Sequence, residues 1–419
     1  MRILFVSRRV YPDSVGEGGS VSAFYIAKAV QSKGHEVHFL TFNPGGKPSR
    51  EVVDGVVIHR MDRKILKYFP RFSNLEYMYF QMFFPLLRLV KRLKPDVIHA
   101  LNVESIPACA FVAKILKKIP FFLTVNGLFW CFRGHCLDYN NEYCFKCKFF
   151  KLRKCVADRI GRKSFSVVNL LSWIYLYFHL LEFKYFTKKA DGIFAISNAV
   201  KNCLVVNGFD KDKIFTVYNP LPARKEFKKC EELKLELVGK KKVILYVGRL
   251  SYSKGLDRVI RAMKHIDDAI FLVIGPKDSG KEISSNYSEL FKLCEEEGVL
   301  DKVKFLGYVD NKELYKYYAI ADVSILLGTY YEPFSRFLLE SCGHGVPMVG
   351  ANVGGNPEIV TDKTGIILKS FSSWEVADAV KKVISRKDKL SKGCLEQSKK
   401  YSLLNLGKEI CKVYGVSNE

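Results

Sequence analysis

The chain contains the same local pattern twice, and this repetition limits the folds that are open to it. Each copy has an apolar strand, a loop rich in glycine or basic residues, a helix and a second apolar strand. Strands that are apolar along their whole length are typical of parallel sheets, which helices cover on both faces. The pattern therefore predicts two doubly wound α/β domains. The expected elements are a strand at 2–7, a loop at 16–19, a helix at 20–33 and a strand at 36–41, then a strand at 242–248, a helix at 256–265 and a strand at 269–274.

The remaining sequence continues this alternation, and a length of 419 residues suits two or three domains. Further strands are expected at 96–100, 121–125, 192–196, 303–306, 323–327 and 346–349. The segment 221–242 is charged and lacks a strong apolar pattern, so we interpret it as a linker. We expect an N-terminal domain at 1–222 with a Cys-rich insertion near 131–155, a C-terminal domain at 223–390, and a C-terminal helix at 391–419 that crosses back to the first domain.

The charge of the chain indicates an anionic partner. Lysine and arginine number 67 against 43 acidic residues, which gives a formal net charge of +24. No zinc-finger pattern and no aromatic RNA-binding consensus occurs in the sequence, so we expect no nucleic-acid partner. The first residues lack the features of a signal peptide, and twelve cysteines without such a signal favour a reducing compartment. We therefore expect a cytoplasmic protein, bound peripherally to the cytoplasmic face of a membrane.

The segment 165–181 is the most apolar stretch of the chain. It is near the short limit for crossing a bilayer, and Asn169, Ser172 and His179 interrupt it. A buried or interfacial helix is therefore expected in preference to a transmembrane span.

Two carboxylates, Glu332 and Glu340, follow the apolar strand expected at 323–327. Pro333 suits the first turn of a helix, and Glu340 would lie about two turns further along. The N-terminus of a helix after a parallel strand favours an anionic ligand, because free N–H groups and the macrodipole converge there. One carboxylate at the mouth and one deeper could each accept sugar hydroxyls, which suits a phosphate flanked by two polyols. Taken alone, the same spacing also occurs on solvated helices.

Two loops could approach phosphate groups. Arg249 and Lys254 follow the strand at 242–248, where two fixed cations can hold a diphosphate. The loop at 16–20 is rich in glycine, so its backbone amides can come close to a ligand. It is neither a dinucleotide fingerprint nor a P-loop. Either loop, taken alone, is also consistent with an ordinary surface loop.

These motifs occur in one order, and the order is more specific than any single motif. The glycine loop, the Gly-Arg…Lys-Gly loop at 248–255, the Glu pair and the Gly-Gly-Asn-Pro-Glu motif at 354–358 together resemble the retaining glycosyltransferases of family 4. The resemblance covers nearly the whole chain. It implies the GT-B fold, with two Rossmann-like doubly wound parallel-sheet domains facing a cleft. It also implies transfer of a sugar from a nucleoside diphosphate sugar with the anomeric configuration kept and no cofactor for catalysis.

The resemblance assigns most of the named residues to the donor. It implies that Arg249 and Lys254 bind the diphosphate and that the backbone of Phe334, Ser335 and Arg336 caps the phosphate. It implies further that Glu332 lies beside the donor sugar as a catalytic residue and that Glu340 binds the ribose. Gly18 and Gly19 are implied to close over the donor.

The sequence departs from the family pattern at two places. The family often has glycine on both sides of the phenylalanine, where this chain has Pro333 and Ser335. The family often has histidine at the strand end where this chain has Asn126, which we keep as a catalytic candidate. Asparagine can form hydrogen bonds but cannot titrate, so chemistry on the acceptor side could be altered.

A cluster of cysteines follows Asn126. Cysteines at this spacing suit tetrahedral zinc, and we predict a structural zinc site, with free thiols or an iron–sulfur cluster as alternatives. The predicted ligands are Cys131, Cys136, Cys144, Cys147 and Cys155. The basic and aromatic residues around them could face anionic lipid head groups or form a solvated face.

The sequence thus predicts a retaining glycosyltransferase whose acceptor is a glycan or a lipid-linked glycan. A nucleotide-sugar epimerase or phosphorylase of the same architecture, or a non-catalytic, metal-stapled membrane scaffold, are the alternatives. An anionic membrane surface is the expected further partner. The residues expected to contact it in the first domain include Lys64, Lys67, Arg71, Arg88, Lys91 and Arg92.

Overall fold

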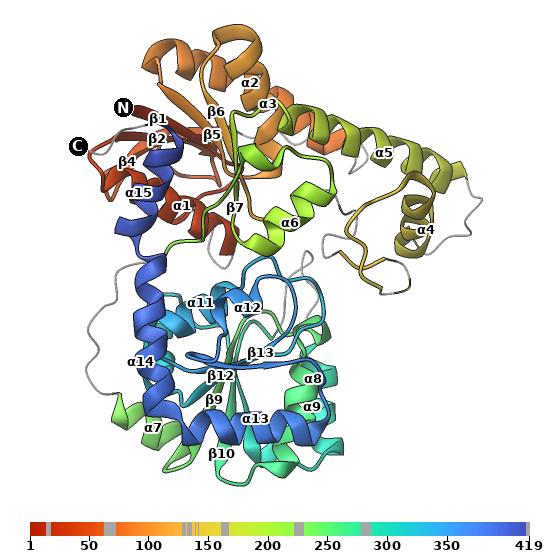
Figure 1. Cartoon of the computed structure of the whole chain (residues 1–419), viewed down its shortest axis with the longest axis vertical. Coiled ribbons are helices and arrows are strands. Elements are labelled where there is room, and N and C mark those ends of the chain that lie inside the picture. Colours follow the sequence, from red (N-terminus) through yellow and green to blue (C-terminus); the bar gives the residue numbers. More distant parts are fainter. Residues whose placement is uncertain are drawn as a thin grey trace. The chain divides into compact units, whose positions relative to one another are not determined.

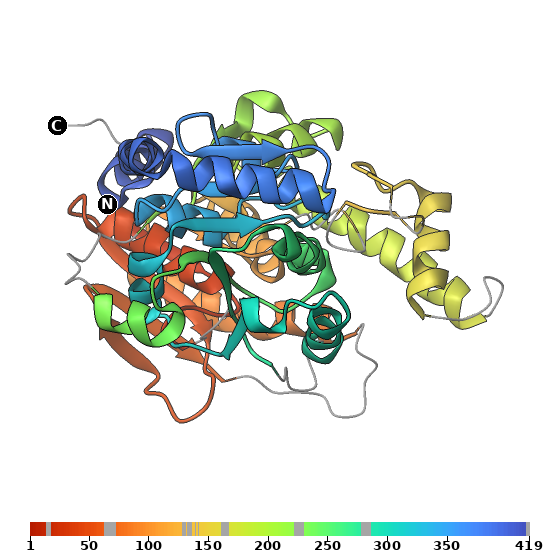
Figure 2. The same ribbon diagram turned by 90° about the horizontal axis from the view of Figure 1, so that it is seen from below.

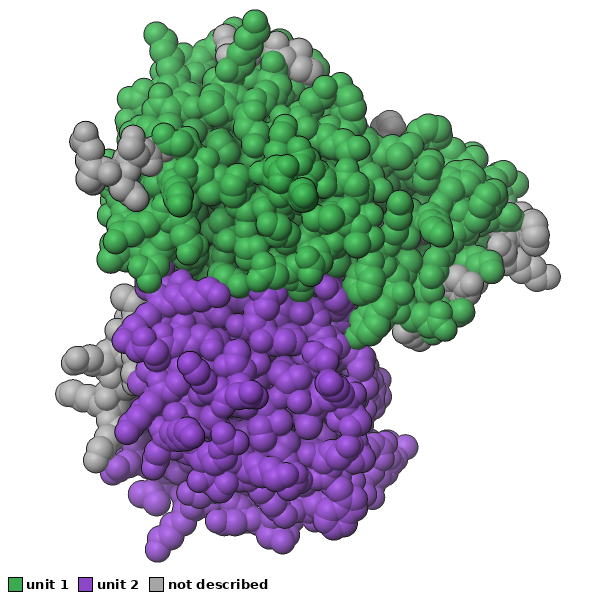
Figure 3. Space-filling view, in the orientation of Figure 1, with its two compact units in different colours: residues 1–220, 403–419 green, residues 221–402 purple. Residues whose placement is uncertain are grey.

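The computed structural model describes residues 1–13, 18–62, 73–127, 131, 136–138, 140, 142–160, 167–221, 230–277 and 286–415. The chain forms two compact units (Figure 3). Unit 1 comprises Met1–Pro220 and Leu403–Glu419, and unit 2 comprises Leu221–Ser402. Each unit is an α/β domain built on a parallel sheet, as the repeated pattern predicts.

Unit 1 contains a sheet in the order β3-β4-β2-β1-β5-β6-β7-β8. Its strands are parallel except for β3, which pairs antiparallel with β4 at one edge. The central strands are buried almost throughout, which explains their unbroken apolar sequence. The strands are β1 (Arg2–Val6), β2 (Glu36–Phe42), β3 (Arg50–Val53), β4 (Val56–Met61), β5 (Val97–Ala100), β6 (Phe121–Val125), β7 (Gly192–Ala195) and β8 (Ile214–Thr216).

The helices of unit 1 pack on this sheet, with the exception of an arm. The helices are α1 (Gly18–Gln31), α2 (Ser73–Leu93), α3 (Ile106–Ala110), η2 (Phe111–Lys117), α4 (Phe149–Ile160), α5 (Val167–Thr187), α6 (Asn198–Val206) and α15 (Leu403–Val413). Helix α4 and the first half of α5 project away from the sheet (Figures 1 and 2). They enclose a separate small apolar core formed by Leu152, Val156 and Trp173. We call α4, α5 and the preceding residues 142–148 the arm.

Unit 2 contains a parallel sheet in the order β11-β10-β9-β12-β13-β14. The strands are β9 (Lys242–Val247), β10 (Ala269–Ile274), β11 (Val303–Gly307), β12 (Val323–Leu326), β13 (Met348–Ala351) and β14 (Gly365–Leu368). The helices are α7 (Glu231–Val238), α8 (Leu256–Ala262), α9 (Tyr287–Glu296), α10 (Leu314–Ile320), α11 (Arg336–Gly343), α12 (Asn356–Ile359), α13 (Ser373–Ser385) and α14 (Lys387–Ser398). The expected linker at 221–242 is not featureless, because α7 lies within it and contacts α10 in unit 2. Residues 222–229 of that segment lie outside the described part of the chain.

The segment 391–419, expected as one C-terminal helix, is divided between the units. Residues 391–398 belong to α14 in unit 2, whereas α15 belongs to unit 1 and packs on α1. The contact with α1 is close, since a Cβ atom at Gly407 would lie 2.3 Å from the carbonyl oxygen of Ala29.

His99 on β5 is completely buried in unit 1. Its Nε2 lies 2.7 Å from Thr124 Oγ1, and its Nδ1 is hydrogen-bonded to the hydroxyl of Tyr414, just after α15. Burial lowers the pKa of His99 to about 3, so the imidazole is neutral in the folded chain. His99 therefore helps to attach the returning end of the chain to the sheet.

This burial predicts acid sensitivity of unit 1. The pKa of His99 is lowered on folding, so the unfolded chain binds an extra proton below about pH 6.5. The free energy of unfolding is therefore unaffected by the titration of His99 above that pH. It falls by up to about 1.4 kcal/mol per pH unit as the pH drops toward the pKa of His99 in the folded chain. Urea unfolding of His99→Gln should show a shallower loss of stability between about pH 6 and about pH 4 than the parent chain. Tyr414→Phe, which removes the hydrogen bond and keeps the imidazole, should lower stability while retaining the steep pH dependence. Equal slopes for His99→Gln and the parent chain would contradict the assignment.

Candidate functional site

Both sheets have a point where the strand order reverses. In unit 1, β1 lies between β2 and β5, and in unit 2, β9 lies between β10 and β12. Successive crossovers leave such a central strand in opposite directions, which opens a crevice beyond the carboxyl ends of the strands. The predicted donor-binding and catalytic residues, but not the predicted zinc ligands, fall at these two places.

In unit 2, Lys254 and Glu332 form a contact at the reversal point. Lys254 Nζ lies 2.9 Å from Glu332 Oε2, and both side chains are largely buried. The hydroxyl of Tyr330 is hydrogen-bonded to both groups, and Lys254 Nζ also lies 4.5 Å from the centre of the Tyr330 ring. The loops after β9 and β12 are thus joined through one cation, one carboxylate and one phenol.

Close backbone approach holds these loops in place. A Cβ atom at Gly255 would lie 2.3 Å from the carbonyl oxygen of Leu327, so only glycine allows the β9 and β12 loops to meet. Gly354 has φ +54°, and a Cβ there would lie 1.9 Å from the carbonyl oxygen of Glu332. The same carbonyl accepts a hydrogen bond of 2.8 Å from the Gly355 amide. The Gly-Gly motif of the sequence therefore fixes the backbone of Glu332.

Arg249 is exposed in the loop after β9. Its carbonyl oxygen accepts a hydrogen bond of 2.7 Å from the hydroxyl of Tyr246, which is fully buried. Burial raises the pKa of Tyr246, so the hydroxyl remains a donor. The buried Tyr246 hydroxyl thus holds the backbone of the loop that carries the Arg249 guanidinium.

The helix after Glu332 starts later than predicted. Its N-cap is Ser335, whose side-chain oxygen accepts a hydrogen bond from the Leu338 amide, and α11 begins at Arg336. Pro333 therefore lies before the helix and not in its first turn, and Glu340 lies just over one turn along it. The Phe334 side chain is buried and packs against Tyr401, so Phe334 can offer only its backbone to a ligand.

Glu340 is held by two neighbours within unit 2. Its Oε1 lies 2.9 Å from Nε of Arg336, and its Oε2 accepts a hydrogen bond of 3.0 Å from the hydroxyl of Tyr318. Burial, and after it the Glu340 charge, raises the pKa of Tyr318 well above its usual value. The carboxylate is therefore oriented before any ligand arrives.

In unit 1, a pocket of about 210 Å³ lies beyond the ends of β1, β5 and β6. Gly19 and Asn126 both line it, together with Arg8, Arg9 and Glu104. Gly18 and Gly19 belong to the first turn of α1, which starts earlier than the predicted residue 20. A Cβ at Gly19 would meet nothing within 4 Å, so packing does not require glycine there. Gly16 and Glu17 of the predicted loop lie outside the described residues.

Asn126 has a fixed orientation in this pocket. Its Nδ2 donates a hydrogen bond of 3.0 Å to the carbonyl oxygen of Leu101, which assigns the amide orientation. Its buried Oδ1 has no hydrogen-bond partner among the described residues. Asn126 is therefore oriented to accept a hydrogen bond from a ligand.

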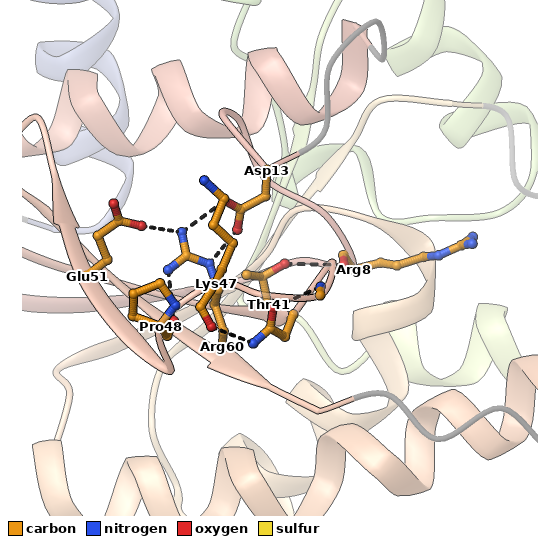
Figure 4. Close-up of polar contacts among 9 residues, drawn as sticks. Arg8, Asp13, Thr41, Lys47, Pro48, Glu51 and Arg60 are labelled. Atoms are coloured by element: carbon orange, nitrogen blue, oxygen red, sulfur yellow. Dashed lines mark hydrogen bonds and ion pairs between the residues drawn. The ribbon is translucent and has the colours of Figure 1, made fainter.

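A buried guanidinium anchors the segment that leads from β1 toward α1 (Figure 4). Nε and Nη2 of Arg60 on β4 lie 2.6 and 2.9 Å from the two carboxylate oxygens of Asp13, and Nη2 also lies 2.7 Å from Glu51 Oε2. Thr41 donates a hydrogen bond of 3.2 Å to the Arg8 carbonyl oxygen. These contacts hold the segment that precedes the glycines of α1 against β2 and β4.

The predicted zinc site is not supported by the structure. Among the residues that the structure describes, no three or more His, Cys, Asp or Glu side chains are arranged to hold a metal ion. No three of the five described thiols come together to hold an ion. Hydrogen bonds to Cys131 and to Cys203 of α6 raise the pKa of the Cys136 thiol, whereas Cys144 Sγ lies 3.5 Å from the carbonyl oxygen of Lys146. Cys147 lines a different cavity, in the arm. The residues described here do not fit a shared zinc ion.

Several site residues were missed from the sequence. Tyr330 and Tyr318 were missed because aromatic residues near buried strands are more often core. Arg8 and Glu104, whose side chains lie 3.3 Å apart in the unit 1 pocket, follow β1 and β5. The convergence of parallel strand ends could have indicated them.

Models of two known families match the chain. The family described as Glycosyltransferase Family 4 matches residues 16–224, and the family described as Glycosyl transferases group 1 matches residues 228–401. An uncharacterized glycosyltransferase of Methanocaldococcus jannaschii is 32% identical over 250 residues, which cover 56% of this chain and 62% of that protein. Alignments with curated relatives at 30–32% identity cover 42% to 62% of those proteins' length.

Solved structures show the same fold. Sucrose-phosphate synthase from Thermosynechococcus elongatus superimposes with a TM-score of 0.76 at 18% identity, over 99% of this chain and 98% of that one. HepE of Anabaena in complex with UDP superimposes with a TM-score of 0.68 at 18% identity, over 100% of both chains. The fold is the GT-B fold.

Substitution by alanine should have different effects on the free energy of unfolding at Gly354 in unit 2 and at Gly19 in unit 1. Gly354→Ala should destabilise unit 2 by about 2–4 kcal/mol, because the added methyl group meets the Glu332 carbonyl and φ is positive. Gly19→Ala should leave stability unchanged or raise it by up to about 1 kcal/mol, because alanine is the better helix former and the space is open. Urea unfolding of both variants measures the difference. Similar losses for the two variants would contradict the close approach at Gly354.

Proposed function

This chain belongs to the group 1 and family 4 glycosyltransferases, and we propose that it is a glycosyltransferase that transfers a sugar from a nucleoside diphosphate sugar with retention of the anomeric configuration. We further propose that the acceptor is a lipid-linked glycan presented at an anionic membrane face. The observation that carries the proposal is the Lys254–Glu332 contact beside the N-terminus of α11.

The unit 2 residues suit a diphosphate and two polyols. Lys254 is fixed by Glu332, and the exposed Arg249 guanidinium stands on an anchored loop, so two cations are available for a diphosphate leaving group. The first N–H groups of α11 supply a further positive field. The oriented Glu340 carboxylate suits ribose hydroxyls, and Glu332 suits hydroxyls of the donor sugar.

The mechanism we propose is a front-face substitution. The bond between the anomeric carbon and the diphosphate oxygen breaks while the acceptor oxygen bonds to the same face of that carbon. The acceptor's proton passes to the departing diphosphate oxygen, so charge and protons balance without a protein base. Arg249, Lys254 and the α11 N-terminus stabilise the negative charge that develops on the diphosphate. Glu332 is paired with Lys254 and hydrogen-bonded to Tyr330. We therefore assign it the role of orienting the donor sugar, and not that of a covalent nucleophile.

The unit 1 pocket supports a role for Asn126 toward the acceptor. Its Oδ1 has no partner among the described residues and can accept a hydrogen bond from an acceptor hydroxyl. Because an amide does not titrate, Asn126 can orient the hydroxyl but cannot remove its proton. This fits a mechanism in which the leaving diphosphate takes that proton. Gly18 and Gly19 would allow close approach of a ligand to the α1 N-terminus, since the space beside Gly19 is open.

Uridine nucleotides are the first donors to test. HepE of Anabaena was solved with UDP and with UDP-glucose. The basic composition supports an anionic membrane as the place of the acceptor. Arg88, Lys91 and Arg92 of the expected basic surface are exposed on α2, whereas Lys64, Lys67 and Arg71 lie outside the described residues.

The diphosphate assignment predicts loss of binding and of transfer on removal of either cation. UDP or another nucleoside diphosphate should raise the unfolding temperature of the parent chain, because a ligand of the folded state stabilises it. Arg249→Ala and Lys254→Ala should each lose most of that shift and lower kcat/KM by about 30- to 1,000-fold, which corresponds to about 2–4 kcal/mol.

A matched control is Lys389→Ala, which removes an exposed lysine of α14 in the same unit and should behave as the parent chain. Near-parent transfer by both site variants would exclude the diphosphate assignment. An equilibrium between two sugar nucleotides with no new glycosidic bond would instead indicate an epimerase.

The acceptor assignment predicts a selective defect at Asn126. Asn126→Ala should lower kcat/KM for the acceptor about tenfold, the cost of one oriented hydrogen bond, while the thermal shift with nucleotide stays unchanged. Asn43→Ala, which removes an amide from an exposed loop of the same unit, is the control. A loss of nucleotide binding in Asn126→Ala would place the residue at the donor instead.

A further inference from the structure

Helix α5 exposes an apolar face. Its buried face is mixed, with the polar residues Asn169, Ser172, His179 and Thr187 beside Trp173 and Phe183. Its solvent face carries large apolar side chains, with Leu171 63% and Phe178 64% exposed. The solvent face of a surface helix in a water-soluble domain is normally polar.

The exposed apolar residues form one continuous row. They recur every three or four positions over the whole helix, so they lie on a single face. The row, which we call the apolar stripe, consists of Val167, Leu170, Leu171, Ile174, Phe178, Leu181 and Tyr185. Phe150 of α4 adds a further exposed ring, 72% accessible. Single exposed apolar residues need no explanation, but a row along five turns indicates an interaction surface.

The arm that carries the stripe is strongly basic. Between residues 146 and 189 the sequence has eleven lysine and arginine residues and two acidic ones, Asp158 and Glu182. Lys146, Lys148 and Lys154 are exposed before and within α4, and Lys188 follows α5. An apolar face flanked by cations is the pattern that binds the interface of an anionic bilayer.

A cavity of about 290 Å³ lies next to the stripe. Lys146, Lys148 and Lys184 line it on the polar side, and Tyr177, Leu180 and Leu181 line it on the apolar side. Leu181 belongs to the stripe as well, so the cavity opens beside it. Burial lowers the pKa of Lys184, and the nearby charges of Lys146 and Lys188 lower it further. Within the described part of the chain neither Lys146 nor Lys184 forms an ion pair, so an anion would relieve this repulsion.

We propose that the arm is a membrane-docking device, with the stripe inserted among acyl chains and the cavity holding the phosphate of an anionic lipid head group. The proposal deepens the proposed function, on which it rests for the membrane-bound acceptor. No described helix has the length and hydropathy needed to cross a bilayer, so the arm lies in the interface. The space-filling view shows the arm as a protruding part of unit 1 (Figure 3).

The charge favours lipid over a second copy of the chain as the occupant. Two copies meeting through their arms would bring two basic flanks together, each on a chain of net charge +24. An anionic bilayer interacts favourably with both the apolar stripe and the cations, whereas a neutral bilayer interacts favourably with the stripe alone.

The test is co-sedimentation of the full chain with vesicles of phosphatidylcholine, either alone or with about one third phosphatidylglycerol. The parent chain should bind the anionic vesicles much more strongly. Lys146→Ala/Lys184→Ala should weaken that binding about 30-fold, or about fivefold for each lysine. Leu171→Gln/Phe178→Gln should weaken it at least about tenfold, because less apolar surface enters the bilayer.

Matched controls replace the same residue types in unit 2. Lys389→Ala/Lys392→Ala removes two exposed lysines from α14, and Leu235→Gln/Leu300→Gln replaces two exposed leucines. Each control should stay within about twofold of the parent chain. The replaced side chains of the stripe are exposed, so their loss leaves no core cavity, and unchanged thermal unfolding verifies folding.

Parent-like vesicle binding by both arm variants would overturn the proposal. So would a stripe variant that converts a dimer to a monomer, measured by light scattering, with vesicle binding intact. Nucleotide-induced thermal shifts distinguish this failure from failure of the proposed function. The arm variants should keep those shifts, because none of the predicted donor residues lies in the arm. A parent chain that binds vesicles but no nucleotide would refute the donor assignment and leave the arm proposal standing.

Discussion

The candidate donor site depends on backbone contacts that only glycine allows. Gly255 brings the loop after β9 against Leu327, and Gly354 brings the loop after β13 against Glu332. With these loops in contact, Lys254 reaches Glu332 at 2.9 Å and Tyr330 is hydrogen-bonded to both. A side chain at either glycine would separate the loops, and the cation and the carboxylate would no longer share a site. The charged residues carry the chemistry, but the glycines determine where these residues lie.

The two units share one architecture but carry different side chains at the reversal point of the sheet. In unit 2 the reversal point of the sheet carries paired charges that are already oriented by neighbours, as at Glu340 with Arg336 and Tyr318. In unit 1 it carries a polar pocket in which Asn126 has an acceptor atom without a partner among the described residues. Preorganised charge suits a leaving diphosphate, and an oriented neutral amide suits a hydroxyl group. Unit 1 also carries the arm, whose exposed apolar stripe has no role in the packing of the sheet.

The repeated pattern and the ordered motifs were sufficient to predict the fold class, and Lys254 and Glu332, named from the motifs, meet in unit 2. Parallel strands and glycine loops leave local signals, so β1, β9 and β12 were placed within a residue or two. The start of α11 was misplaced because Pro333 suits a first helical turn, whereas the Ser335 side chain caps the helix. The prediction that 221–242 is a linker was wrong in part, because α7 forms within it. The apolar pattern of α7 is weak, and its stability comes from packing on α10.

The sequence by itself determined the architecture, the glycosyltransferase family and the identity of the charged residues, because these follow from local periodicity and from motif order. Tertiary structure decided which side chains meet. It buried His99 against Tyr414, left the described thiols without the group of three or more ligands that a zinc ion needs, and exposed an apolar face of α5. A hydropathy profile reports how apolar a segment is, but not which face of its helix the neighbours cover. For α5 that depends on how α4 and the sequence-distant α3 pack against it, which the residues of α5 alone do not indicate.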